Sequence, residues 1–115
     1  MGKLFKGHET TIEKINDDIL TYRGLIEKYL VVKDIGVQEK QINYISELKL
    51  LFKYIGESLL FLKNNFNLSK DESKVFEIIG IFLSDENNLN FNLKLKKLDD
   101  FLELHGDKIR YLKKK

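Results

Sequence analysis

Two histidines, His8 and His105, are the side chains of this sequence best suited to metal binding or to proton transfer near neutral pH. A di-iron bundle needs two Glu-x-x-His motifs, and a zinc protease needs a second histidine four residues after the first. Neither arrangement is present, since His8 is followed by Glu-Thr-Thr-Ile. We therefore expect structural or surface roles, with His8 in an N-terminal arm and His105 at the edge of the core.

Acidic side chains occur in pairs at Asp17–Asp18 and at Asp99–Asp100. Carboxylate acid–base catalysis needs two carboxylates across a cleft, whereas neighbours on a helix point about 100° apart. We expect both pairs on solvated helix faces, and Asp18 and Asp100 are candidates for ion pairs with a neighbouring helix.

Phosphate-binding loops are not predicted, because every glycine stands alone. Gly24, Gly56 and Gly80 fall inside expected helices, where they would let another helix approach closely. Gly106 is expected to bend or interrupt the last helix. The chain has no cysteine, which excludes thiol catalysis and thiolate metal sites. The sequence thus predicts no catalytic residue, no metal and no cofactor.

Basic residues near the end of the chain are the one set that suggests a ligand. They would contact nucleic-acid phosphates or an anionic membrane surface, and Tyr111 would be available for base stacking. The alternative is that these cations complement a helix dipole and keep the protein in solution. The candidate nucleic-acid-binding residues are Lys94, Lys96, Lys97, Lys108, Arg110, Lys113, Lys114 and Lys115.

The spacing of apolar residues predicts helices as the elements that position these side chains. Two series recur at alternating intervals of three and four, the pattern of a buried helical stripe. The complete absence of proline is typical of a largely helical chain. The series are Ile12, Ile15, Ile19, Tyr22, Ile26 and Tyr29, then Ile45, Leu48, Phe52, Ile55, Leu59, Leu62 and Phe66.

Four helices are expected from these series and from capping signals. The first runs from the cap at Thr10, with Glu13 in the reciprocal position, to about Asp34, and Gly36 ends it. The second covers about 37–66, the third follows a Ser69–Glu72 capping box, and the fourth covers about 95–112. The third has so broad an apolar face that we expect other helices to bury it. Residues 84–92 are predicted as a loop with Leu89 and Phe91 turned inward.

The whole chain, 1–115, is therefore predicted to be one all-α domain resembling a four-helix bundle. One long antiparallel hairpin packs with two shorter helices, residues 1–9 form a flexible arm, and residues 113–115 form a basic tail. No signal peptide and no membrane span are apparent, which favours a cytoplasmic protein. The excess of lysine and asparagine is typical of AT-rich genomes, including those of phages and mobile elements.

The function predicted from these features is non-enzymatic binding of a protein partner, of the adaptor, inhibitor, immunity or chaperone type, or self-association as a homo-oligomer. The second helix is longer than the third, so part of its apolar stripe is left to a partner unless the shorter helices cover it. The candidate partner-binding residues are Tyr44, Leu51, Tyr54 and Phe61. The alternative is a nucleic-acid-binding accessory protein or small complex subunit that uses the basic set.

Overall fold

The structure is a computed structural model that describes residues 12–34 and 38–115. Four helices follow one another: α1 (Ile12–Asp34), α2 (Gln38–Asn65), α3 (Lys70–Ser84) and α4 (Phe91–Ile109). The predicted all-α fold of four helices is confirmed. The predictions for His8, the arm 1–9, the Thr10 cap and Gly36 lie outside the described residues.

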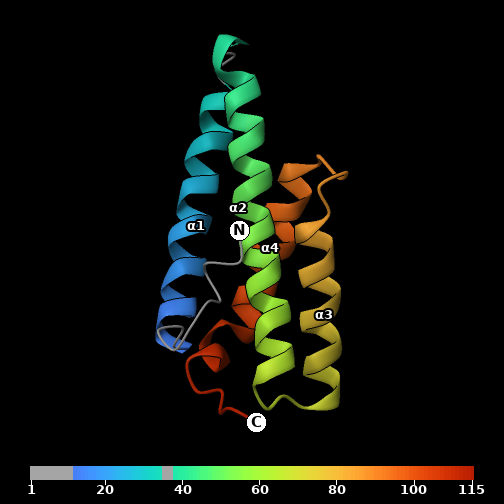
Figure 1. The fold of residues 1–115 in the computed structure, drawn as a ribbon. Helices are drawn as coiled ribbons and strands as arrows, with labels where there is room; N and C mark the ends of the chain where they lie inside the picture. The colour runs from blue at the N-terminus through green and yellow to red at the C-terminus, as the bar shows by residue number, and fades with distance from the viewer. Residues whose placement is uncertain (1–11, 35–37) are drawn as a thin grey trace.

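The arrangement of the helices places α2 at the centre of the molecule. α1 and α3 flank α2, and α4 closes the bundle by packing against both α1 and α3 (Figure 1). α1 and α2 form the predicted long antiparallel hairpin, and one end of it extends beyond α3 and α4 (Figure 1). α3 and α4 are therefore a second layer that covers only part of the hairpin.

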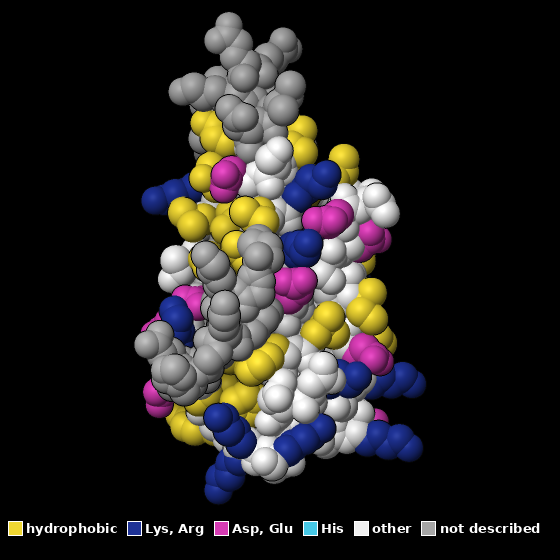
Figure 2. Space-filling view, viewed as in Figure 1, with side chains coloured by type: hydrophobic (Ala, Val, Ile, Leu, Met, Phe, Trp, Pro, Cys, Tyr) yellow, Lys and Arg dark blue, Asp and Glu magenta, His cyan; other side chains and the backbone are white. Residues whose placement is uncertain are grey.

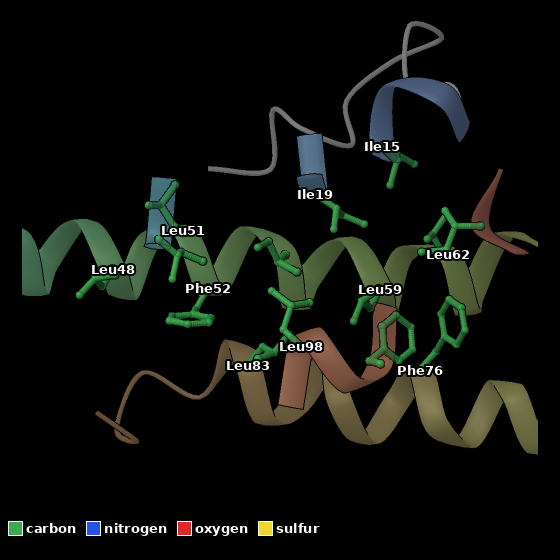
Figure 3. Packing of buried hydrophobic residues seen from close by; sticks show 14 of the residues in the cluster. Ile15, Ile19, Leu48, Leu51, Phe52, Leu59, Leu62, Phe76, Leu83 and Leu98 are labelled. Atoms are coloured by element: carbon green, nitrogen blue, oxygen red, sulfur yellow. The ribbon is translucent and has the colours of Figure 1, made fainter. Parts of the chain in front are cut away.

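The predicted stripe on α2 is the core of the protein. Figure 3 shows residues of α1 approaching α2 from one side and residues of α3 and α4 from the other. Ile45, at the start of the stripe, is only partly buried. The described apolar side chains with no exposed surface are Leu48, Phe52, Ile55, Leu59 and Leu62 of α2, Ile15, Ile19 and Ile26 of α1, Leu83 of α3, and Leu98 and Ile109 of α4.

Glycines allow a close contact between α2 and α3. A Cβ atom on Gly56 would lie 2.5 Å from the carbonyl oxygen of Gly80 and 2.8 Å from the amide nitrogen of Ser84. The predicted close approach is confirmed for Gly56 and Gly80. It is wrong for Gly24, where a Cβ would meet nothing within 4 Å. α4 continues as a helix through Gly106.

The predicted capping box begins α3. The Ser69 hydroxyl accepts a hydrogen bond from the Glu72 amide at 3.1 Å, and the Glu72 carboxylate accepts one from the Ser69 amide at 3.1 Å. The second carboxylate oxygen of Glu72 accepts a hydrogen bond from the ammonium group of Lys108. The Glu72 side chain therefore accepts a hydrogen bond at the start of α3 and also joins this helix to the end of α4.

This arrangement gives the fold an acid-sensitive contact. The Lys108 ammonium and the Ser69 amide lower the pKa of Glu72 from 4.5 to about 2. A carboxyl with a lowered folded pKa contributes stability that is complete above its unfolded pKa and is lost as the pH falls toward the folded value. Because Lys108 is largely exposed, we expect this contribution to be only about 1 kcal/mol, lost between about pH 5 and pH 2. In urea titrations between about pH 5 and pH 2, the free energy of unfolding should fall less for Glu72→Gln than for the wild type. An equal fall in both proteins would contradict the assignment to Glu72.

The connection between α3 and α4 is shorter than predicted. The Asn90 side chain caps α4 by accepting a hydrogen bond from the Leu93 amide at 3.1 Å, so the helix begins at Phe91. Phe91 is 2% exposed and stacks on Phe52 with ring centroids 5.9 Å apart, which confirms its inward orientation. The same prediction is wrong for Leu89, which lies before the cap and is 50% exposed.

An ion pair joins α1 to α4, but through neither of the two aspartates that are candidates from the sequence. Arg23 donates from Nε to Oδ1 of Asp99 at 2.9 Å and from Nη2 to Oδ2 at 3.0 Å. Asp100, one residue later on α4, pairs with Lys96 of its own helix at 3.4 Å. Asp18 likewise pairs within α1, with Lys14 at 3.5 Å. The bidentate geometry with Arg23 fixes how α4 docks on α1.

Candidate functional site

α3 presents apolar side chains to solvent as well as to the core. Ile78 and Ile81 are 56% and 57% exposed. Only Phe76, Gly80 and Leu83 of this helix are buried. The prediction that other helices bury α3 is therefore wrong: α2 covers one face, and α4 does not cover the opposite side.

Two hollows lie side by side between α3 and α4, and together we call them the α3–α4 groove. They share two lining residues, Ile79 of α3 and Lys97 of α4, so they are adjacent. The first hollow, of about 220 Å³, is also lined by Ile78, Phe82 and Leu93. The second, of about 200 Å³, is also lined by Val75, Asp100, Phe101, Leu104 and His105.

The polar side chains that line the α3–α4 groove are few: Lys97, Asp100 and His105. Asp100 pairs with Lys96, and the His105 ring packs on Phe101 with centroids 5.2 Å apart. That contact agrees with the predicted place of His105 at the edge of the core. Lys97 lines both hollows, and the part of the chain that the structure describes offers it no ion pair. The groove thus combines apolar walls with one unpaired cation.

The aromatic residues predicted to bind a partner on the long hairpin have partners within the protein. Tyr54 stacks on Tyr22 at 5.5 Å between ring centroids, and Tyr44 packs on Tyr29 at 5.3 Å. These contacts join α2 to α1, so the tyrosines hold the hairpin together. A role in partner binding for Tyr44 and Tyr54 stays a prediction.

Phe61 and Leu51, the other two residues of that set, pack against or within the core. Phe61 is partly buried and meets Phe66 edge-on at 6.4 Å between centroids. Leu51 is 6% exposed and belongs to the core cluster. Leu51 therefore leaves the candidate set, because its side chain offers almost no surface to a partner.

Lys94 is the clearest departure from the predicted basic set. Its side chain is 1% exposed, and its ammonium group donates to the carbonyl oxygens of Leu83 at 3.2 Å and Asp85 at 2.7 Å. It also lies 5.7 Å from the centroid of the Phe52 ring. Lys94 thus closes the C-terminal end of α3 from inside the protein and is not available to a phosphate. Burial lowers the pKa of Lys94.

The sequence did contain a signal for the burial of Lys94. Phe91, Lys94, Leu98, Phe101 and His105 alternate at intervals of three and four, the same rhythm as the core stripe of α2. Phe91, Leu98 and Phe101 are buried, so the one lysine in this series lies among core positions. Because the neighbouring Lys96 and Lys97 are off this rhythm, they remain exposed.

The predicted basic tail is held to the connection between α2 and α3. The Asn67 amide donates to the carbonyl oxygen of Lys113 at 2.7 Å, and the Lys115 amide donates to that of Asn65 at 3.2 Å. Phe66 and Lys114 form an antiparallel bridge between these bonds. Figure 2 shows Lys and Arg side chains gathering at this end of the molecule. Nucleic-acid binding by Lys113, Lys114 and Lys115 stays a prediction.

The other members of the basic set are separated by acidic neighbours. Lys96 pairs with Asp100, and Lys108 pairs with Glu72. Arg110 is exposed at the end of α4. It lines a hollow of about 370 Å³ together with Glu13, Asn16, Asp17 and Tyr111, where the two carboxylates disfavour a phosphate. The structure therefore does not bring the predicted set together as one continuous basic surface.

The fold and the site define an all-α bundle with an exposed apolar groove on one face. Among residues 12–34 and 38–115, no three acidic or histidine side chains converge as ligands of a metal ion would. None of the described helices combines the length and the apolar character needed to cross a bilayer. Comparisons with protein-family models, with curated protein sequences and with solved structures found no match to this chain.

Proposed function

We propose that this protein acts by binding a protein partner and that the α3–α4 groove is its docking surface. The observation that carries the proposal is the exposed apolar lining of this groove, where Ile78 of α3 is 56% exposed. Leu93 and Leu104 of α4 extend this apolar surface, at 38% and 76% exposure. Clustered apolar surface of this kind is typical of sites that another protein covers.

The proposal keeps the function class predicted from the sequence but assigns it to a different surface. On the long hairpin, the aromatic side chains already pack on partners within the chain. In the groove, Ile78 and Leu93 line a hollow into which a further side chain fits. Burying such exposed side chains contributes roughly 25 cal/mol per Å² of apolar surface. We therefore expect docking at the groove to gain the most free energy.

An acidic substitution in the groove tests this assignment. We expect Leu93→Asp and Ile78→Asp each to reduce recovery of the natural partner from source cells by about 30-fold, as loss of a central contact of about 2 kcal/mol does. Leu20→Asp is the matched control, because Leu20 is 48% exposed on α1 and lies outside the groove. Recovery should be quantified by mass spectrometry, with circular dichroism confirming the helix content of each variant. Unchanged recovery with both groove variants would overturn the proposal.

A further inference from the structure

We infer that the partner presents an acidic amphipathic helix to the α3–α4 groove, with two apolar side chains in the two hollows and a carboxylate on Lys97. This inference rests on the proposed function and specifies the chemistry of its partner. It follows from two features of the groove: the extent of its hollows along α3 and the position of its cation.

The apolar lining of the groove is long enough along α3 for successive contacts of one helix. Val75 lines one hollow and Phe82 the other. The two linings together cover about 10 Å of α3, at 1.5 Å per residue, and they share Ile79. Side chains at positions i and i+4 of a docked helix are about 6 Å apart, and those at i and i+7 are about 10 Å apart. A helix lying along the groove can therefore fill both hollows from one face.

The charge of the groove selects an acidic helix over a basic one. Lys97 contributes to the wall of both hollows, so a docked helix must lie against it. The described ion pairs leave Lys97 without a carboxylate, while the nearby Asp100 already pairs with Lys96. Lys74 is also exposed on α3, one turn from Ile78, and no described ion pair includes it. A partner carboxylate would pair with Lys97, whereas a partner lysine would meet like charge.

A second copy of this chain fits the groove less well. A twofold symmetric contact brings the same surface of both subunits together. Centred on the groove, it would place one Lys97 ammonium beside the other, in a setting that apolar side chains partly desolvate. The charge that favours an acidic helix thus disfavours self-association through this surface.

The probe for this inference is a displayed library of amphipathic helices about five turns long. Each library helix carries a fixed stripe of leucines on one face, and the positions that flank this stripe vary among Glu, Gln and Lys. We expect Glu to be enriched on the wild type and Lys to be enriched on Lys97→Glu. The best acidic helix should bind the wild type about tenfold more tightly than Lys97→Glu, the effect of one partly desolvated charge pair.

Lys28→Glu is the matched control, because it makes the same charge change at an exposed side chain on α1 that lines neither hollow and belongs to none of the described ion pairs. It should retain the preference for Glu. Equal enrichment of Glu and Lys on the wild type, failure to enrich any helix, or enriched helices that still bind Leu93→Asp would each overturn the inference.

Failure of this inference and failure of the proposed function give different results. If the library shows no acidic preference but Leu93→Asp still abolishes recovery of the natural partner, the groove is the docking surface and only the acidic helix is wrong. If partner recovery is insensitive to Leu93→Asp, the docking surface itself is wrong. A concentration-dependent dimer in light scattering that Leu93→Asp removes would overturn the acidic helix in favour of a second copy.

Discussion

Gly56→Ala is expected to destabilise the protein by about 3 kcal/mol, the upper range for an overpacked contact. The added methyl group would lie 2.5 Å from the carbonyl oxygen of Gly80, which is backbone and cannot rotate away. Alanine favours a helix interior over glycine by about 1 kcal/mol, so the steric cost outweighs the gain in helix propensity. The free energy of unfolding from urea titrations measures the difference.

The matched control for this substitution is Gly24→Ala on α1. A Cβ at Gly24 would meet nothing within 4 Å, so only the propensity term remains. We expect Gly24→Ala to stabilise the protein by about 0.5 to 1 kcal/mol. Opposite signs for the two variants would establish the close contact between α2 and α3. A stabilising Gly56→Ala would show that the two helices are further apart.

Lys94→Met is expected to destabilise the protein by about 2 kcal/mol, although methionine nearly preserves the shape of the side chain. The ammonium group of Lys94 donates to the carbonyl oxygens of Leu83 and Asp85 at the end of α3. Each buried carbonyl that loses its donor costs about 1 to 3 kcal/mol. Burial of the ammonium group lowers the pKa of Lys94, so relief from burying the charge offsets part of this loss.

The control for Lys94→Met is Lys96→Met, two residues along the same helix. Lys96 is exposed, and its ion pair with Asp100 lies within one helix. We expect this change to alter stability by less than about 0.5 kcal/mol. Thermal and urea unfolding of both variants provide the comparison. A Lys94→Met protein as stable as the wild type would mean that the ammonium group contributes nothing to closing α3.

The sequence predicted those parts of the structure that local spacing determines. The predicted apolar stripe is buried from Leu48 to Phe66, and the capping box of Ser69 and Glu72 forms with both hydrogen bonds. These features depend on residues a few positions apart, where helix geometry fixes which side chains meet.

The candidate site was predicted less well, because tertiary packing decides which apolar faces are covered. The pattern of α3 gives Ile78 and Phe76 similar apolar character, yet only Phe76 is buried. Nothing in that pattern says that α4 leaves the outer side of α3 open. Lys94 is assigned to the basic set because it is a lysine. Its spacing, however, places it on the core face of α4.

Main-chain hydrogen bonds between residues 65–67 and 113–115 close a loop that contains α3 and α4, and we call this pairing the clasp. Asn67 and Lys114 are separated by 47 positions, so closing this loop costs roughly 3 kcal/mol of chain entropy. Docking of α3 and α4 must offset that cost before the clasp can hold. The amides of Asn67 and Lys115 are hydrogen bonded across the clasp. Their exchange with deuterium therefore reports the opening of this pairing, which can occur without unfolding of the molecule as a whole.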